Sequence, residues 1–84
     1  MTGQSLVRRL RNTPVRLLIR ALEKDGFTYR GRKGSGRLYR HTNGRRAVIH
    51  YHKGSETLTP KTLQSVLMGA RWNEDDVKRL GLVS

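Results

Sequence analysis

The sequence contains no cysteine, few acidic residues and no long apolar run, and each absence excludes a class of protein. Without cysteine the chain can form neither a disulfide nor a thiolate metal site, which is compatible with a reducing compartment. No apolar run approaches the roughly 20 residues that a membrane-spanning helix needs. Leu6-Val7 is too short for the core of a secretion signal, and arginines follow it. We therefore expect a cytoplasmic protein that does not enter the membrane.

The six acidic residues show no paired spacing of the kind that acid–base enzymes use. Glu23 and Asp25 lie at the end of a predicted helix, and residues 74–76 lie in the first turn of another. Glu56 is the one carboxylate that we expect near a site.

Three histidines are the remaining candidates for metal ligands. His50 and His52 share one face of a predicted strand, and His41 lies on the neighbouring strand. A zinc site needs three or four ligands, and no thiolate or carboxylate completes this set. We therefore expect no metal and no cofactor.

The charge is strongly basic and uneven. The chain has 18 Lys and Arg against 6 Asp and Glu, a net charge of +12. Residues 1–53 hold 14 of the cations and 2 of the anions, so the rest of the chain is neutral. Such an asymmetry favours a polyanionic partner, most often a nucleic acid. A merely solvated surface and an acidic protein partner are the alternatives.

Paired threonine and proline residues mark the starts of two helices, because threonine caps a helix and proline suits its first turn. Thr13-Pro14 predicts a helix over about residues 14–25, and Thr59-Pro60 opens a second one. Asn73 caps a short last helix. The apolar positions of the second helix are Leu63, Val66, Leu67 and Ala70.

Three strands are predicted between these helices, over residues 27–30, 38–42 and 46–51, with Asn43-Gly44 as a two-residue hairpin turn. This turn sets a register in which Leu38 faces Ile49 and Gly36 faces Tyr51. The first hairpin, turning on residues 31–34, brings Phe27 opposite Leu38 and Tyr29 opposite Gly36. The predicted core face carries Phe27, Leu38, Ala47 and Ile49. The predicted outer face carries Thr28, Arg37, Tyr39, His41, Val48 and His50.

The predicted fold is therefore α+β, in the order α-β-β-β-α, with a three-stranded antiparallel sheet, helices on one of its faces and a short extra C-terminal helix. We expect one domain over residues 1–84. Residues 1–12 form an N-terminal extension, either a short extra helix or a loose segment.

The stretch from Gly31 to His41 is a glycine-spaced basic loop that runs into a strand. Glycines let the backbone approach a phosphate closely, and the cations between them attract it. Tyr39 lies among these cations and could stack on a base. The basic cluster comprises Arg32, Lys33, Arg37, Arg40, Arg45, Arg46 and Lys53. The register puts Arg40 on the helix side, where a charge is awkward, so that Arg40 either reaches past the rim of the sheet or is turned outward by a bulge. The candidate nucleic-acid-binding residues are Arg32, Lys33, Ser35, Arg37, Tyr39, Arg45, Arg46, His50, His52 and Lys53.

Five short motifs in order resemble the HicA toxin family, small RNA-cleaving toxins of bacteria and archaea that are paired with HicB antitoxins. The motifs are Asp25-Gly26-Phe27, Lys33-Gly34-Ser35-Gly36, Asn43-Gly44-Arg45-Arg46, His52 with Glu56, and Lys61-Thr62-Leu63-Gln64-Ser65-Val66-Leu67. The resemblance covers about residues 14–71. It implies a double-stranded-RNA-binding-like fold, and mRNA and a HicB-like antitoxin as partners.

The chain departs from the family at the catalytic position. The family's catalytic histidine follows the Gly-Ser step, and here that position is Gly36, which has no proton to move. The resemblance therefore implies a metal-independent endoribonuclease, or mRNA interferase, that is inactive in this form, whether by nature or by design. His50 is the only nearby substitute, and the predicted register points it to the other face. The alternative is a non-catalytic RNA-binding module. A DNA-binding protein is disfavoured, because no helix carries a basic reading face.

Overall fold

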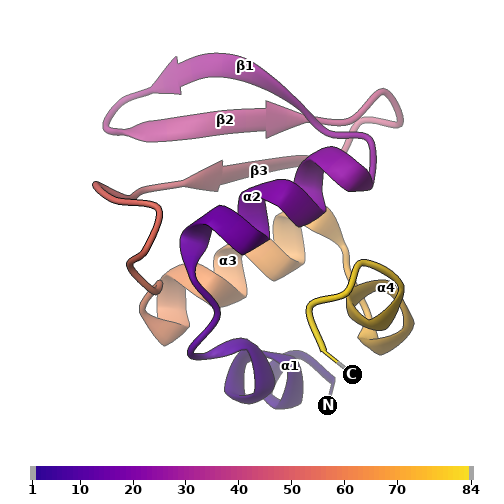
Figure 1. The fold of residues 1–84 in the computed structure, drawn as a ribbon. Coiled ribbons are helices and arrows are strands. Elements are labelled where there is room, and N and C mark those ends of the chain that lie inside the picture. Colours follow the sequence, from indigo (N-terminus) through magenta and orange to yellow (C-terminus); the bar gives the residue numbers. More distant parts are fainter. Residues whose placement is uncertain (1, 84) are drawn as a thin grey trace.

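The computed structural model describes the backbone of residues 2–83 and the side chains of residues 6–83 (Figure 1). Seven elements follow one another: α1 (Thr2–Leu10), α2 (Val15–Lys24), β1 (Thr28–Lys33), β2 (Gly36–Arg40), β3 (Arg46–Ile49), α3 (Pro60–Ala70) and α4 (Glu74–Arg79). The sheet is antiparallel in the order β1-β2-β3. The helices α2 and α3 lie together on one side of it (Figure 1). The predicted α+β class and the order α-β-β-β-α are confirmed.

The register between β2 and β3 differs by one residue from the prediction. Leu38 pairs with Val48, and Tyr39 pairs with Ala47. The hairpin loop has three residues rather than two, because the closing hydrogen bond runs from His41 N to Arg45 O at 2.8 Å. Gly44 takes a left-handed φ of 98°, as the last residue of a three-residue loop often does.

This slip reverses the faces of β2, because successive side chains of a strand point to opposite faces. Tyr39 points to the helices and is only 5% exposed. Leu38 points to the outer face and is half-buried beside Val48. Ala47 and Ile49 are buried as predicted.

The hairpin between β1 and β2 also differs from the prediction. It turns on Gly34 and Ser35, between the paired residues Lys33 and Gly36. The register shifts between Tyr29 and Arg32, so β1 contains a bulge. The predicted pairs of Phe27 with Leu38 and of Tyr29 with Gly36 are therefore wrong. Phe27 is buried as expected, but it lies just before β1.

The hydrophobic core joins the sheet to the helices. The N-terminal segment is a helix, and Leu6 and Leu10 of α1 are 2% and 1% exposed. In Figure 1, α1 lies against α3 on the side away from the sheet. The helix α1 thus contributes Leu6 and Leu10 to the core. The buried apolar residues are Leu6, Leu10, Val15, Leu18, Ala21, Leu22, Phe27, Tyr39, Ala47, Ile49, Leu58, Leu63, Val66, Leu67, Ala70, Trp72, Val77 and Leu80.

A glycine sets the distance between α3 and the sheet. A Cβ atom on Gly69 would lie 2.4 Å from the carbonyl oxygen of Arg46, well inside van der Waals contact. Only glycine allows the helix backbone to approach β3 this closely. This position therefore fixes how α3 packs under the end of the sheet that holds the 41–45 loop.

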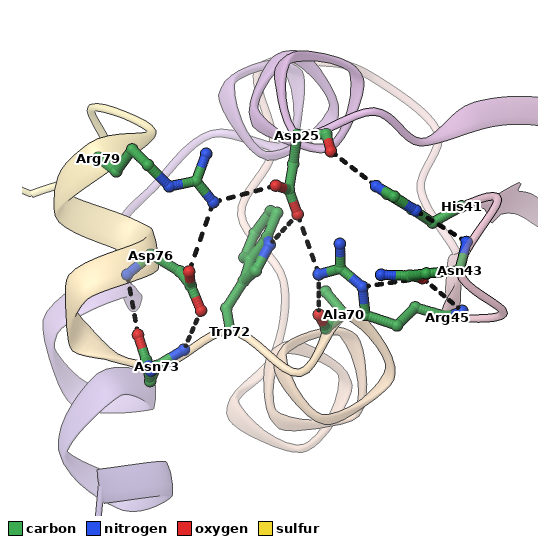
Figure 2. Close-up of polar contacts among 9 residues, drawn as sticks. All are labelled: Asp25, His41, Asn43, Arg45, Ala70, Trp72, Asn73, Asp76 and Arg79. Carbon is green, nitrogen blue, oxygen red and sulfur yellow. Dashed lines mark hydrogen bonds and ion pairs between the residues drawn. The ribbon is translucent and has the colours of Figure 1, made fainter.

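A polar cluster around Asp25 ties four parts of the chain together (Figure 2). The Asp25 carboxylate is 8% exposed and accepts hydrogen bonds from Arg45, Trp72 and Arg79 at 3.0, 2.9 and 3.0 Å. The backbone oxygen of Asp25 faces His41 Nε2 at 2.9 Å. The end of α2 is thus joined to the 41–45 loop, to the segment after α3 and to α4.

Candidate functional site

Gly36 begins β2 at the end of the sheet where β1 ends and β3 ends (Figure 1). It is buried, although it faces the outer side of the sheet with Leu38 and Val48. A Cβ atom at this position would lie 2.6 Å from Val48 Cγ1 and 2.8 and 2.9 Å from His50 Cε1 and Nε2. The imidazole of His50 therefore occupies the space that a side chain at position 36 would enter.

The prediction of which residue lies beside Gly36 is wrong. The one-residue slip moves Tyr51 away from the position opposite Gly36 and brings His50 to its side. His50 and Gly36 thus share a face of the sheet. The expectation that His50 points to the other face is wrong.

Ser35 fixes one nitrogen of the His50 ring. Its hydroxyl oxygen lies 3.1 Å from His50 Nδ1, and both side chains are exposed. Ser35 lies in the tight turn between Lys33 and Gly36, so the turn presents the hydroxyl to the neighbouring strand. This contact engages Nδ1 and leaves Nε2 as the ring nitrogen for a ligand.

Exposed cations lie at both ends of this outer face. Lys33 pairs with Gly36, and Arg40 pairs with Arg46 at the opposite end of β2. All three cations are exposed. Like charges directly opposite one another destabilise a sheet, so the pair Arg40–Arg46 favours an anionic ligand between or above them. Arg32 is also exposed. It lies near the end of β1, where it pairs with Arg37 of β2.

The loop after β3 adds His52 and Lys53, which are both exposed. The Glu56 carboxylate accepts hydrogen bonds from the backbone N–H groups of both residues, at 3.0 Å for Lys53. These bonds, from Lys53 first and His52 second, lower the pKa of Glu56. The loop is tied to the start of α2, because Val15 N donates to Glu56 O at 2.8 Å. Glu56 thus lies near the site, as predicted, and holds its loop in place.

Three of the predicted RNA contacts have other partners. Tyr39 is buried, its ring lies 5.6 Å from that of Tyr29, and burial raises its pKa. The prediction that Tyr39 stacks on a base is therefore wrong. Arg37 faces the helix side, where it donates to the Tyr51 hydroxyl and lies 4.4 Å from the centre of that ring. Arg45 donates to the Asp25 carboxylate and, at 2.7 Å, to the Ala70 carbonyl, so it would have to leave these bonds to reach a phosphate.

The sequence placed Arg40 in the basic cluster but on the wrong face, so Arg40 was left out of the RNA-binding residues, and Trp72 received no role. The signal for Arg40 was its charge, because a charged residue at a predicted core position contradicts the register that puts it there. Turning Arg40 outward turns Leu38 and Gly36 outward as well. Trp72 offered no local signal, since its partner Asp25 lies 47 residues earlier.

Within residues 2–83, no group of three His, Asp or Glu side chains gathers closely enough to hold a metal ion. The same residues include no helix with the length and apolar character needed to cross a membrane.

Comparison with known proteins identifies the family. The family model described as HicA toxin of bacterial toxin-antitoxin matches residues 15–72, from the start of α2 to the residue after α3 and its cap. No curated protein matches the chain. The matched segment covers more than half of the sequence and includes residues 32–53. The chain therefore belongs to the HicA toxin family of bacterial toxin–antitoxin systems.

Proposed function

We propose that this chain is an RNA-binding toxin of the endoribonuclease type, an mRNA interferase of a type II toxin–antitoxin system that acts in the cytoplasm as one domain. Family membership supports the toxin role. The observation that carries RNA binding is the exposed cross-strand pair Arg40–Arg46 on the same sheet face as His50. Its repulsion is relieved when a phosphate neutralises it.

The proposed RNA surface comprises the outer face of β2 and β3 and the two loops beside it. Phosphates contact the cations, whereas Ser35, His50 and His52 lie where a ribose or base would follow. We call this set the outer-face site. Its residues are Lys33, Ser35, Arg40, Arg46, His50, His52 and Lys53, whereas Arg32 pairs with Arg37 and lies on the helix side.

Position 36 takes no part in proton transfer, because glycine carries no acid or base. The sequence-based expectation that the chain is inactive rests on this position. It also rested on the predicted register, which pointed His50, the only nearby substitute, to the other face. The competing function is a non-catalytic RNA-binding module, which shares the binding surface and differs only in the absence of cleavage.

The binding proposal predicts a salt-dependent affinity for RNA. Each phosphate contact removed should lower the slope of log K against log salt by about 0.7–0.9. Arg40→Ala and Arg46→Ala should each show such a decrease in fluorescence-anisotropy titrations at several salt concentrations. Arg11→Ala is the matched control, because Arg11 is an exposed arginine just after α1 that lines a groove with Pro60 and Lys61 at the start of α3. Equal slopes in all four proteins, or no RNA binding at low salt, would contradict the proposal.

A cognate antitoxin similar to HicB is the proposed protein partner, and we expect it to cover the residue-36 end of the sheet. A cationic surface favours a partner of complementary charge. Co-expression with the product of a neighbouring antitoxin gene, followed by hydrogen exchange of the complex, should show protection in residues 33–36 and 48–53. Protection confined to α4 would contradict inhibition by masking of this surface.

A further inference from the structure

We infer that His50 is the catalytic proton carrier of this chain and stands in for a side chain at position 36. This inference rests on the proposed function, since it assigns a residue to the RNA cleavage proposed above. The neighbouring strand supplies the imidazole at the place where glycine leaves room for it.

The geometry around Gly36 carries the inference. The ring atoms Cε1 and Nε2 of His50 lie 2.8 and 2.9 Å from the position of a Cβ atom at residue 36. Real Cβ atoms do not tolerate such contacts, so His50 in this conformation requires glycine at position 36. The position of the His50 ring therefore depends on the absence of a side chain at residue 36.

The ring is also oriented as a general base requires. Ser35 engages Nδ1 at 3.1 Å, and this contact fixes the direction in which Nε2 points. When Nδ1 carries the proton and donates it to the hydroxyl oxygen, Nε2 has a free electron pair. An imidazole has an intrinsic pKa near neutrality, so it can both accept and release a proton under cellular conditions. Ser35 is thus a positioning residue for His50.

The other two histidines are less suited to this role. His41 Nε2 lies 2.9 Å from the Asp25 carbonyl oxygen, and Asn43 N donates to His41 Nδ1 at 3.1 Å. Both nitrogens of His41 therefore serve the fold. His52 is exposed in the loop after β3, two residues beyond His50.

The reaction that one imidazole supports is transfer of the phosphodiester to the ribose 2′-oxygen. His50 Nε2 accepts the proton of the 2′-hydroxyl while the O2′–P bond forms and the P–O5′ bond breaks. The leaving O5′ takes a proton from water, and His50 returns its proton to solvent. The products are a 2′,3′-cyclic phosphate and a 5′-hydroxyl end. Lys33, which pairs with Gly36, stabilises the charge that develops on the phosphate, and the pair Arg40–Arg46 binds the RNA backbone farther along the same face.

The test measures cleavage of a labelled single-stranded RNA by the whole chain in EDTA, together with RNA affinity in the same buffer. His50→Ala should lower the cleavage rate by about 10²–10⁴-fold, the usual contribution of a positioned general base, while RNA binding persists. Arg11→Ala, outside the outer-face site, should cleave at the rate of the unmodified protein. Ser35→Ala should lower kcat more than it changes KM, and Ser35→Thr should restore kcat because it retains the hydroxyl.

Position 36 gives an independent variant. Gly36→Ala places a methyl group where the His50 ring lies, so cleavage should fall while RNA binding persists. Chemical analysis of the products should show cyclic phosphate ends.

Two results would overturn the inference: cleavage by His50→Ala at the unmodified rate, or RNA binding by the unmodified protein without cleavage in EDTA. The first refutes only the assignment of His50, whereas the second also refutes the proposed endoribonuclease activity and favours the non-catalytic module. Absence of RNA binding in the unmodified protein would instead refute the proposed function. The two failures are thus distinguishable in one set of measurements.

Discussion

Asp25 shows how much of the architecture depends on one side chain. Burial raises the pKa of this carboxyl group, but the hydrogen bonds from Trp72 and Arg79 and the charge of Arg45 outweigh it, so the net pKa lies below 3.8. The carboxylate form is therefore favoured in the folded protein. Removal of one partner from a buried ion pair is strongly destabilising, because the remaining charges lose their compensation.

Asp25→Asn should accordingly lower the free energy of unfolding by about 3 kcal/mol at pH 7. Because the folded-state pKa is depressed, the stabilisation is present above the unfolded pKa of about 3.9 and is lost as the pH falls below it. Urea unfolding at pH 7 and pH 3 should show a smaller difference between the two proteins at pH 3. Asp75→Asn, at an exposed position of α4, is the control and should change little. A difference that stays constant with pH would contradict this account.

At the scale of elements, the sequence predicted the helices and strands but not their register. Thr59 caps α3, since it accepts from Thr62 N, and Asn73 forms a capping box with Asp76. These helix caps involve residues close together in the sequence, so they can be predicted from it. The register of β2 depended on whether the Asn43-Gly44 loop has two or three residues, a difference that the same dipeptide permits.

The contact between α3 and β3 gives a second prediction. Gly69→Ala should lower the free energy of unfolding by about 1–3 kcal/mol, because its Cβ meets the Arg46 carbonyl oxygen at 2.4 Å and the backbones must separate. Met68→Ala is the matched control. Met68 is 69% exposed, so the substitution should change the free energy of unfolding by no more than about 0.5 kcal/mol. Thermal unfolding of both variants measures the difference, and equal stability would show that α3 can shift without cost.

At the scale of the whole molecule, the cations of the basic segment, residues 1–53, fall into two groups: some are exposed and others make contacts within the fold. Lys33, Arg40 and Arg46 remain exposed on the outer face, whereas Arg37 and Arg45 are engaged in contacts within the fold. Composition predicts the polyanionic partner but cannot separate these two groups. The separation depends on which face a strand residue occupies, and therefore on the register. His50 was identified in sequence for the same surface, and only the register could bring it to Gly36.

The central claim is that RNA binds the outer face of the sheet beside His50. Its most direct test is an NMR titration of the labelled protein with a short RNA in EDTA. The account predicts that the largest amide shifts fall in residues 33–40 and 46–53, with no comparable shifts in α1 and α4. The competing surface is a groove of about 470 Å³ lined by Val7, Arg8, Arg11, Pro60, Lys61 and Gln64, between α1 and the start of α3. Shifts concentrated in that groove, with residues 33–53 unchanged, would contradict the account.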